Sequence, residues 1–312
     1  IFDYWRVVRD LKLIIKNIQP DLIHAGPIQS CGFLVALARF HPLISMSWGS
    51  DLLLCADTNL LNRWITQYTL SQSTKIIGDC NAVRKKIHEL VKFNDSDIIT
   101  FPWGIKISDF TTIQGSKVRD NLDWNDKFII ISTRNWEKIY GLDLLLKSFF
   151  DIHKQNDEIR LILLGGGSMA SSMLKYINKH KLSSFIHIPG YVSQDQLYSY
   201  LRSADLYVSA SLSDGSSVSL LEAMAIGVPI IVSDIPGNRE WISNNVNGLL
   251  FEFNNYKSLA QTISFAVSDY SNLLIKSKQN LMIINKYANW DTNINKLFNV
   301  YDEVIEKNVI NK

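Results

Sequence analysis

The chain has 312 residues, 46% of them hydrophobic, which is enough for two domains with separate cores. Its net charge of +2 gives no electrostatic reason to expect nucleic acid as a partner. The three cysteines are scattered and odd in number, which excludes a disulfide framework and fits a reducing compartment.

The first part of the sequence alternates short apolar segments with helical patterns. It begins at Ile1 inside a predicted helix, so we expect the natural chain to start upstream of this residue. Helices are predicted at 4–19, 32–40, 59–71 and 82–93, and strands at 21–24, 43–47, 75–78 and 98–101. This alternation predicts a parallel α/β sheet in a first domain, residues 1–110.

The stretch 111–126 is polar and has no apolar periodicity, so we interpret it as a linker. The alternation then restarts in a second domain, residues 127–289. Strands are predicted at 128–132, 160–164, 185–188, 205–209 and 229–232, and helices at 142–154, 168–180 and 194–202. The predicted fold class is α/β, with two doubly wound parallel sheets facing across a cleft. Ligands in such sheets bind beyond the carboxyl ends of the strands.

One segment combines two carboxylates with the start of a helix. Asp214 and Glu222 are eight positions apart, between a predicted strand and a helix that ends at Gly227. A helix start presents N–H groups and a partial positive charge, which suit a phosphate, and the carboxylates can hold sugar hydroxyls. The segment therefore predicts a nucleotide-sugar site. Taken singly, its residues also fit a turn aspartate, a serine cap and a solvated glutamate.

The helical wheel of this segment supports a role for its second carboxylate. Leu220, Leu221 and Met224 share one apolar arc, with Glu222 at its edge and Ala223 opposite. An acid at the border of a buried face can reach a cleft while its helix packs.

The run from Asp214 to Pro229 resembles the donor-site signature of the family 4 glycosyltransferases. These are retaining enzymes with two Rossmann-like domains, an arrangement called the GT-B fold. The resemblance implies that Asp214 contacts the donor sugar and that Glu222 holds the ribose. The family normally has glutamate at the first position, so Asp214 is one methylene shorter. The resemblance also implies that the diphosphate and sugar are received by the backbone of Gly215, Ser216, Ser217, Val218 and Ser219.

A second segment resembles the family's Arg…Lys-Gly motif through Arg134 and Lys138. In the family, such cations stabilise the leaving diphosphate, an interaction that matters most in the transition state. Here Ile139 and Tyr140 separate Lys138 from the glycine. The resemblance implies transfer without a metal or other cofactor, with the cations in place of the metal. The plainer interpretation of both residues is an exposed surface cation.

Other segments carry weaker signals. By the resemblance, Gly166 in a glycine loop and Tyr191 after the next strand lie beside the nucleotide, where the tyrosine could stack on the base. Gly49 and Asp51 follow Trp48, where many family members have histidine, and the resemblance puts them on the acceptor side. The plainer interpretations are a tight turn, a packed aromatic ring and a structural turn with an aspartate cap.

Two charged features have plainer explanations that we favour. Asp95 and Asp97 form an Asp-x-Asp pattern that can hold a divalent cation, but they precede a strand, so we interpret them as a polar turn. A basic stripe on the first helix could meet anionic lipid headgroups, since family members often act on lipid-linked acceptors. We favour a solvated face for this stripe, which consists of Arg6, Arg9, Lys12 and Lys16.

Together these segments predict a retaining glycosyltransferase. It would move a sugar from a UDP- or GDP-linked donor to a saccharide or polyprenyl-linked acceptor in surface polysaccharide assembly. We expect it in the cytoplasm, at the inner face of the cell membrane. The donor domain is 127–289, and the resemblance implies that a helix at 290–312 returns to the acceptor-side domain. Two alternatives stay open, a sugar-nucleotide epimerase and a non-catalytic nucleotide-sugar-binding module.

Overall fold

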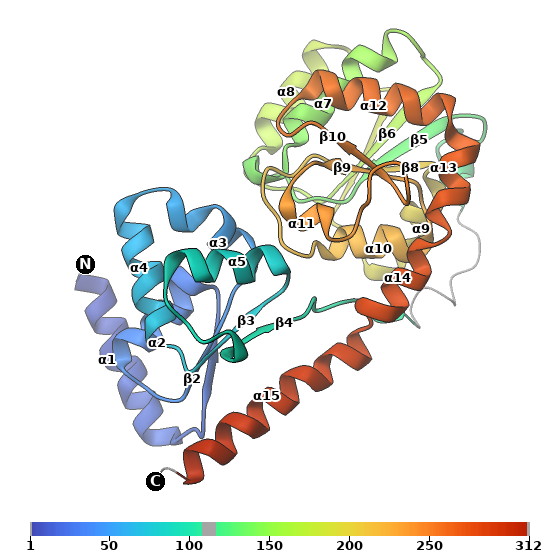
Figure 1. Cartoon of the computed structure of the whole chain (residues 1–312). Coiled ribbons are helices and arrows are strands. Elements are labelled where there is room, and N and C mark those ends of the chain that lie inside the picture. The colour runs from blue at the N-terminus through green and yellow to red at the C-terminus, as the bar shows by residue number, and fades with distance from the viewer. Residues whose placement is uncertain (1, 108–116, 311–312) are drawn as a thin grey trace. The chain divides into compact units, whose positions relative to one another are not determined.

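The computed structural model describes residues 2–107 and 117–310, which form two compact units (Figure 1). The first unit comprises Ile1–Trp103, Ser213–Ser216 and Trp290–Lys312, and the second comprises Gly104–Leu212 and Ser217–Asn289. Each unit holds one all-parallel sheet, which confirms the predicted α/β fold class. Of the predicted linker, residues 111–116 lie outside the described residues, and the rest contains the short helix α6 (Val118–Asn121).

The first unit is built on a four-stranded sheet in the order β1-β2-β3-β4. Neighbouring residues of β3 point to opposite faces. Ile77 packs with Val300 and Val304 of the C-terminal helix, whereas Ile76 packs with Leu70 and Val83 on the other face. The strands are β1 (Ile23–Ala25), β2 (Leu43–Met46), β3 (Lys75–Gly78) and β4 (Ile98–Thr100), and the helices are α1 (Phe2–Ile18), α2 (Phe33–Ala38), α3 (Ser50–Leu53), α4 (Leu60–Ser71), α5 (Asn81–Leu90) and α15 (Trp290–Ile310).

The second unit is built on a six-stranded sheet in the order β10-β9-β8-β5-β6-β7. Most of its strands are buried apolar runs, whereas β7 is only partly buried, and helices cover both faces of the sheet (Figure 1). The strands are β5 (Phe128–Ser132), β6 (Ile159–Leu164), β7 (Ile186–Gly190), β8 (Leu206–Ser209), β9 (Ile230–Ser233) and β10 (Leu249–Phe251). Besides α6, the helices are α7 (Leu142–His153), α8 (Ala170–Lys179), α9 (Gln194–Ser203), α10 (Val218–Ile226), α11 (Pro236–Arg239), α12 (Tyr256–Ser268), α13 (Tyr270–Ser277) and α14 (Asn280–Tyr287).

Two core clusters hold this second sheet between its helices. Ile130 of β5 faces α7, α8 and α12, while its neighbours Ile129 and Ile131 face α9, α10 and α14. All three isoleucines have 0% of their surface exposed. Burial of each such side chain is worth roughly 1.5–3 kcal/mol, so the strand that precedes the predicted arginine is firmly fixed.

Helix α10 is buried over most of its circumference. Ala223, predicted opposite the apolar arc, is as fully buried as Leu220 and Leu221, because α9 and α14 both contact this helix. The helix ends at Gly227, whose φ of 81° is the left-handed conformation that glycine adopts without strain. Burial on several sides gives the start of α10 a fixed place at the edge of the sheet.

The predicted element limits hold to within a few residues. Strands β3 and β5 have the predicted limits, 75–78 and 128–132. The helix predicted at 168–180 begins only at Ala170, because the amide and hydroxyl of Ser168 bind the carboxylate of Glu137. A contact with a side chain from another segment thus sets the start of this helix, which the local sequence pattern does not determine.

Candidate functional site

The loops after β5 and β8 lie together because these two strands are neighbours. Ile130 pairs with Leu206 and Ile131 with Tyr207, so both strands end at the same edge of the sheet. The loop after β5 carries Arg134, and the segment after β8 leads to Ser217 at the start of α10. The strand order changes direction at this pair, which is where ligands of doubly wound sheets bind.

The side chain of Arg134 connects these two loops. It is buried, with 7% of its surface exposed, and its Nη1 donates to the Oγ of Ser217. Ser217 holds the cap position of α10, but its hydroxyl makes no capping bond to the helix. A guanidinium and the positive end of a helix dipole therefore lie together, and both attract an anion such as phosphate.

Glu222 lies one turn further along α10. Burial raises the pKa of its carboxyl from 4.5 to about 7, while the positive charge of Arg134 acts in the opposite direction. Since the carboxyl is affected by the same guanidinium, the structure brings Glu222 into the region of Arg134. This carboxyl changes its charge near neutral pH, so its capacity to accept hydroxyl hydrogen bonds also changes there.

The second predicted cation, Lys138, does not share the burial of Arg134. Its side chain is exposed, at the start of a single 3₁₀ turn, Lys138–Tyr140. The residue of this turn that contacts Arg134 is Tyr140, whose ring centroid lies 4.0 Å from the guanidinium carbon. In the sequence Tyr140 only interrupts the expected motif, and nothing in its local pattern indicates this contact.

The glycine loop after β6 lies against the end of β7. A Cβ added to Gly166 would lie 3.2 Å from the ring of Tyr191, and that tyrosine is 75% exposed. The structure therefore brings these two predicted residues together, with most of the ring open to solvent. The loop is also held by Glu137, whose carboxylate accepts from the amide and the hydroxyl of Ser168. These bonds lower the pKa of Glu137.

In the first unit, the carboxylate of Asp51 stabilises the turn in which this residue lies. Only 6% of it is exposed, and its carboxylate accepts from four internal donors. Burial raises its pKa, and the hydrogen bonds oppose that change. The geometry matches a structural turn with an aspartate cap. The four donors are the amides of Ile28, Trp48 and Leu52, at 3.0 Å each, and the hydroxyl of Ser47, at 2.6 Å.

The tip of the predicted donor segment, Ser213–Ser216, groups with the first unit and contains the part-buried Asp214. There the amide of Ser216 donates to Asp79 Oδ2 at 2.8 Å, and a Cβ on Gly49 would lie 2.6 Å from the amide nitrogen of Gly215. Burial raises the pKa of Asp79 to about 6. Asp79 follows β3 at its carboxyl end, which is the only sequence signal that could have singled it out.

The two charged features of the first unit behave as surface groups. Asp95 forms ion pairs with Arg84 and His88, and Asp97 pairs with Lys75. Among the residues that the structure describes, no three His, Cys, Asp or Glu side chains converge as metal ligands would. The stripe on α1 is exposed, and Trp5, which is 64% exposed, lies among its cations.

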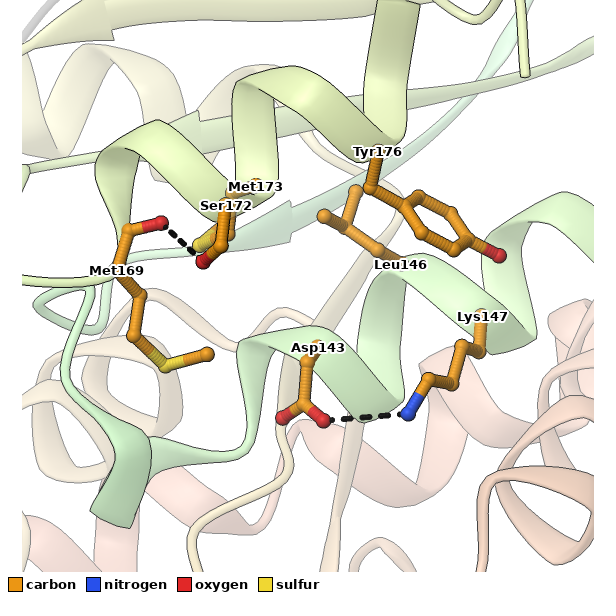
Figure 2. A pocket seen from close by; sticks show the side chains of 7 residues that line it. All are labelled: Asp143, Leu146, Lys147, Met169, Ser172, Met173 and Tyr176. Atoms are coloured by element: carbon orange, nitrogen blue, oxygen red, sulfur yellow. Dashed lines mark hydrogen bonds and ion pairs between the residues drawn. The ribbon is translucent and has the colours of Figure 1, made fainter. Parts of the chain in front are cut away.

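A separate hollow of about 210 Å³ lies between α7 and α8 (Figure 2). Leu146, Met173 and Tyr176 give it apolar walls, and Asp143 and Lys147 form an ion pair of 3.3 Å at its side. Figure 2 shows that its lining comes from the helices rather than from the ends of the strands. It contains none of the residues predicted from the sequence.

In the described part of the chain, no helix is both long and apolar enough to cross a bilayer.

Two family models match the sequence. The model of the glycosyl transferases group 1 covers residues 116–288, and that of glycosyl transferase 4-like proteins covers residues 2–80. The first match includes Arg134, Tyr191 and the whole segment from Asp214 to Glu222. The second covers Gly49, Asp51 and Asp79.

Similar sequences are also found among curated proteins. The GtfA subunit of UDP-N-acetylglucosamine–peptide N-acetylglucosaminyltransferase from Streptococcus pneumoniae is 30% identical over 154 residues, 49% of this chain and 28% of its own length. Alpha-monoglucosyldiacylglycerol synthase from Acholeplasma laidlawii is 24% identical over 216 residues, 63% of this chain and 54% of its own length. The chain thus spans at most 54% of the length of these two relatives.

A solved protein from Anabaena, Alr3699/HepE in complex with UDP-glucose, has a similar fold. The TM-score is 0.81 over 95% of this chain and 82% of that chain, at 18% sequence identity. At this identity the likeness concerns the fold alone.

Proposed function

The chain belongs to the glycosyl transferases of group 1 and has the GT-B fold, and on that premise we propose that it transfers a sugar from a nucleotide-sugar with retention of configuration. The observation that carries this proposal is the cluster of Arg134, the start of α10 at Ser217 and the carboxyl of Glu222. Together they offer a cation, a helix dipole and a hydrogen-bond acceptor, which match the diphosphate and ribose of one ligand.

The proposed roles follow from where charge develops. As the bond from the sugar to the diphosphate breaks, negative charge grows on the leaving oxygens, and a fixed guanidinium stabilises that charge without reorganising. We assign this role to Arg134, with Lys138 as a second cation. Glu222 would accept from the ribose hydroxyls, and Asp214 would contact the donor sugar. The backbone of Gly215 to Ser219 would receive the phosphates, and Tyr191 would stack on the base beside Gly166.

We further propose that transfer needs no metal, because Arg134 already supplies positive charge next to the helix start. Activity that is unchanged by excess EDTA, and not raised by added Mg²⁺ or Mn²⁺, would support this. Activity lost to EDTA and restored by one of these ions would refute it.

For the donor we propose a UDP- or GDP-linked sugar, with UDP-sugars to be tested first. The names of the relatives support this order, since one is named for UDP-N-acetylglucosamine and the solved neighbour holds UDP-glucose. For the acceptor we propose a saccharide or polyprenyl-linked saccharide in surface polysaccharide assembly. A lipid-linked acceptor is supported by the name of one relative, alpha-monoglucosyldiacylglycerol synthase.

A lipid-linked acceptor suggests a peripheral contact with the membrane through α1. Trp5 is exposed beside the cations of the stripe, and tryptophan with lysine and arginine is the composition that favours a lipid interface. Flotation with vesicles of phosphatidylcholine, with and without phosphatidylglycerol, tests this contact. Binding that needs the anionic lipid and is lost in Trp5→Ser supports it, whereas equal flotation of both proteins contradicts it.

The function itself is tested in two steps. Nucleotide-sugars are first screened for those that raise the unfolding temperature, because a ligand that binds the folded state stabilises it. The best donors are then incubated with saccharide and lipid-linked acceptors, and the product's anomeric configuration is read by NMR. A product that keeps the donor's configuration supports the proposal. Release of an epimerised sugar would indicate an epimerase, and binding without turnover would indicate a non-catalytic module.

A further inference from the structure

We infer that Tyr140 is the residue that positions Arg134 for the leaving diphosphate, an inference that rests on the function proposed above. The face of its ring lies against the buried guanidinium, with 4.0 Å between the ring centroid and the guanidinium carbon. Through Nη1 the same guanidinium donates to the hydroxyl of Ser217. The arginine is thus held by both an aromatic ring and the start of α10.

The backbone around Tyr140 is fixed on both sides by the strand end that leads to α10. The carbonyl of Ile139 accepts from the amide of Leu212 at 2.7 Å. A Cβ on Gly141 would lie only 2.1 Å from the carbonyl oxygen of Ala210, so the two backbones touch. Since Ala210 and Leu212 follow β8, the ring is held by the same segment that leads to Ser217.

This arrangement explains how a long side chain can be kept in one place. An arginine has several rotatable bonds, and fixing them costs conformational entropy. A flat ring contacts the guanidinium over its whole face and attracts it through the ring quadrupole, an effect that is stronger where water is excluded. With 7% of Arg134 exposed, the contact is in such a place. Tyr140 would therefore reduce the motion of the charge that stabilises the leaving group.

The structure also distinguishes Tyr140 from its neighbour Lys138. The tyrosine immediately precedes Gly141 and is partly buried, whereas the lysine is two positions earlier and exposed. Of the two, only Tyr140 is in contact with the guanidinium in the described structure. Tyr140, one of the two residues between Lys138 and Gly141, is thus the residue that contacts the arginine.

The test compares the ring with the hydroxyl. Tyr140→Phe keeps the ring face and should leave kcat within about threefold of the wild type, whereas Tyr140→Leu should lower kcat about tenfold or more with little change in KM. Tyr176→Leu, which removes a ring from the hollow between α7 and α8, is the matched control and should leave kcat unchanged. A Phe variant as impaired as the Leu variant would overturn the inference.

A double-mutant cycle shows whether Tyr140 acts through the arginine. In an Arg134→Ala background, Tyr140→Leu should have no further effect on kcat, because the group it positions is gone. A further loss of the same factor would overturn the inference. The same cycle is measured on the unfolding temperature, where the two changes should be less than additive. The unfolding temperatures test the contact between Tyr140 and Arg134 even if the wild-type chain transfers no sugar. Absence of transfer would count against the proposed function instead.

Discussion

The guanidinium of Arg134 donates to the hydroxyl of Ser217, a residue 83 positions further along the chain. This bond joins the end of β5 to the start of α10, and it uses the serine that would otherwise cap the helix. A positive side chain and the positive end of a helix are not natural partners in a folded protein without an anion. Their proximity therefore favours a site for a phosphate rather than an arrangement made for stability.

Replacement of Arg134 by alanine should lower turnover more than donor binding. In the role proposed for it, its charge would interact most strongly with the leaving diphosphate, so we expect kcat to fall about 10²–10³-fold, comparable to the loss of one oxyanion donor. Donor affinity from calorimetry should change by less. Lys175→Ala, which removes an exposed cation on α8, is the control and should match the wild type. An intact kcat in Arg134→Ala would exclude the leaving-group role.

Donor affinity should rise with pH because of Glu222. Its carboxyl has a pKa of about 7, and the ionised form is the stronger acceptor for the ribose hydroxyls, since both of its oxygens accept. Between pH 6 and pH 8 the ionised fraction rises about tenfold, so Kd should fall by up to that factor. A nucleotide-sugar is the proper ligand, since its diphosphate does not titrate in this range. Glu222→Gln should bind weakly with little pH dependence, and a Kd that stays flat in the wild type would contradict the ribose role.

Glu222 should also make the stability of the ligand-free protein depend on pH. The pKa is raised from 4.5 to about 7, so the unfolded chain releases this proton first as pH rises. Stability is therefore full below pH 4.5 and falls until about pH 7, by about 3 kcal/mol for a shift of this size. Asp79, raised from 3.8 to about 6, acts in the same direction over a lower range.

Unfolding temperatures between pH 5 and pH 8 check this expectation. Glu222→Gln cannot ionise, so its unfolding temperature should decline less between pH 6 and pH 7.5 than that of the wild type. Glu252→Gln, at an exposed carboxylate, should leave the slope as it is. Parallel curves for wild type and Glu222→Gln would show that Glu222 is not buried as described.

Two glycines with similar backbone angles should respond very differently to alanine. Gly141 has φ of 60° and Gly227 has φ of 81°, so alanine at either position would pay the left-handed strain of about 1–2 kcal/mol. A Cβ at Gly227 would meet nothing within 4 Å, whereas one at Gly141 would lie 2.1 Å from the carbonyl oxygen of Ala210. Urea unfolding should show Gly141→Ala as the more destabilised by several kcal/mol. Equal losses would mean that the two backbones are not in contact.

The sequence predicts the four strands of the first sheet and five of the second, because most of them are short, buried apolar runs, as in β5. It does not predict β10 (Leu249–Phe251), a run of only three residues. It also predicts the proximity of Arg134 to the start of α10, since parallel strands end at one edge of their sheet. It does not predict Tyr140, Glu137 or Asp79. Each of these makes its contact with a residue far away in the sequence, and no local pattern marks such a contact.

The burial of Ala223 is likewise not predicted by the local pattern of its helix. A helical wheel assumes that one face of a helix meets the core, but α10 has helices on two sides. The wheel therefore places Glu222 at the border of an apolar face, whereas the structure places it where burial raises its pKa. The burial that raises this pKa comes from tertiary packing, which the pattern of one helix does not contain.

The strand order β10-β9-β8-β5-β6-β7 has a consequence for how the protein is made. Strand β5 leaves the ribosome before its partner β8, which follows only after two intervening strands and three helices. Arg134 therefore has no Ser217 to meet until most of the second unit has been synthesised. A nascent chain cannot acquire the bond between them piece by piece, so nucleotide binding would appear late and all at once. Stalled chains of increasing length would show the point at which it appears.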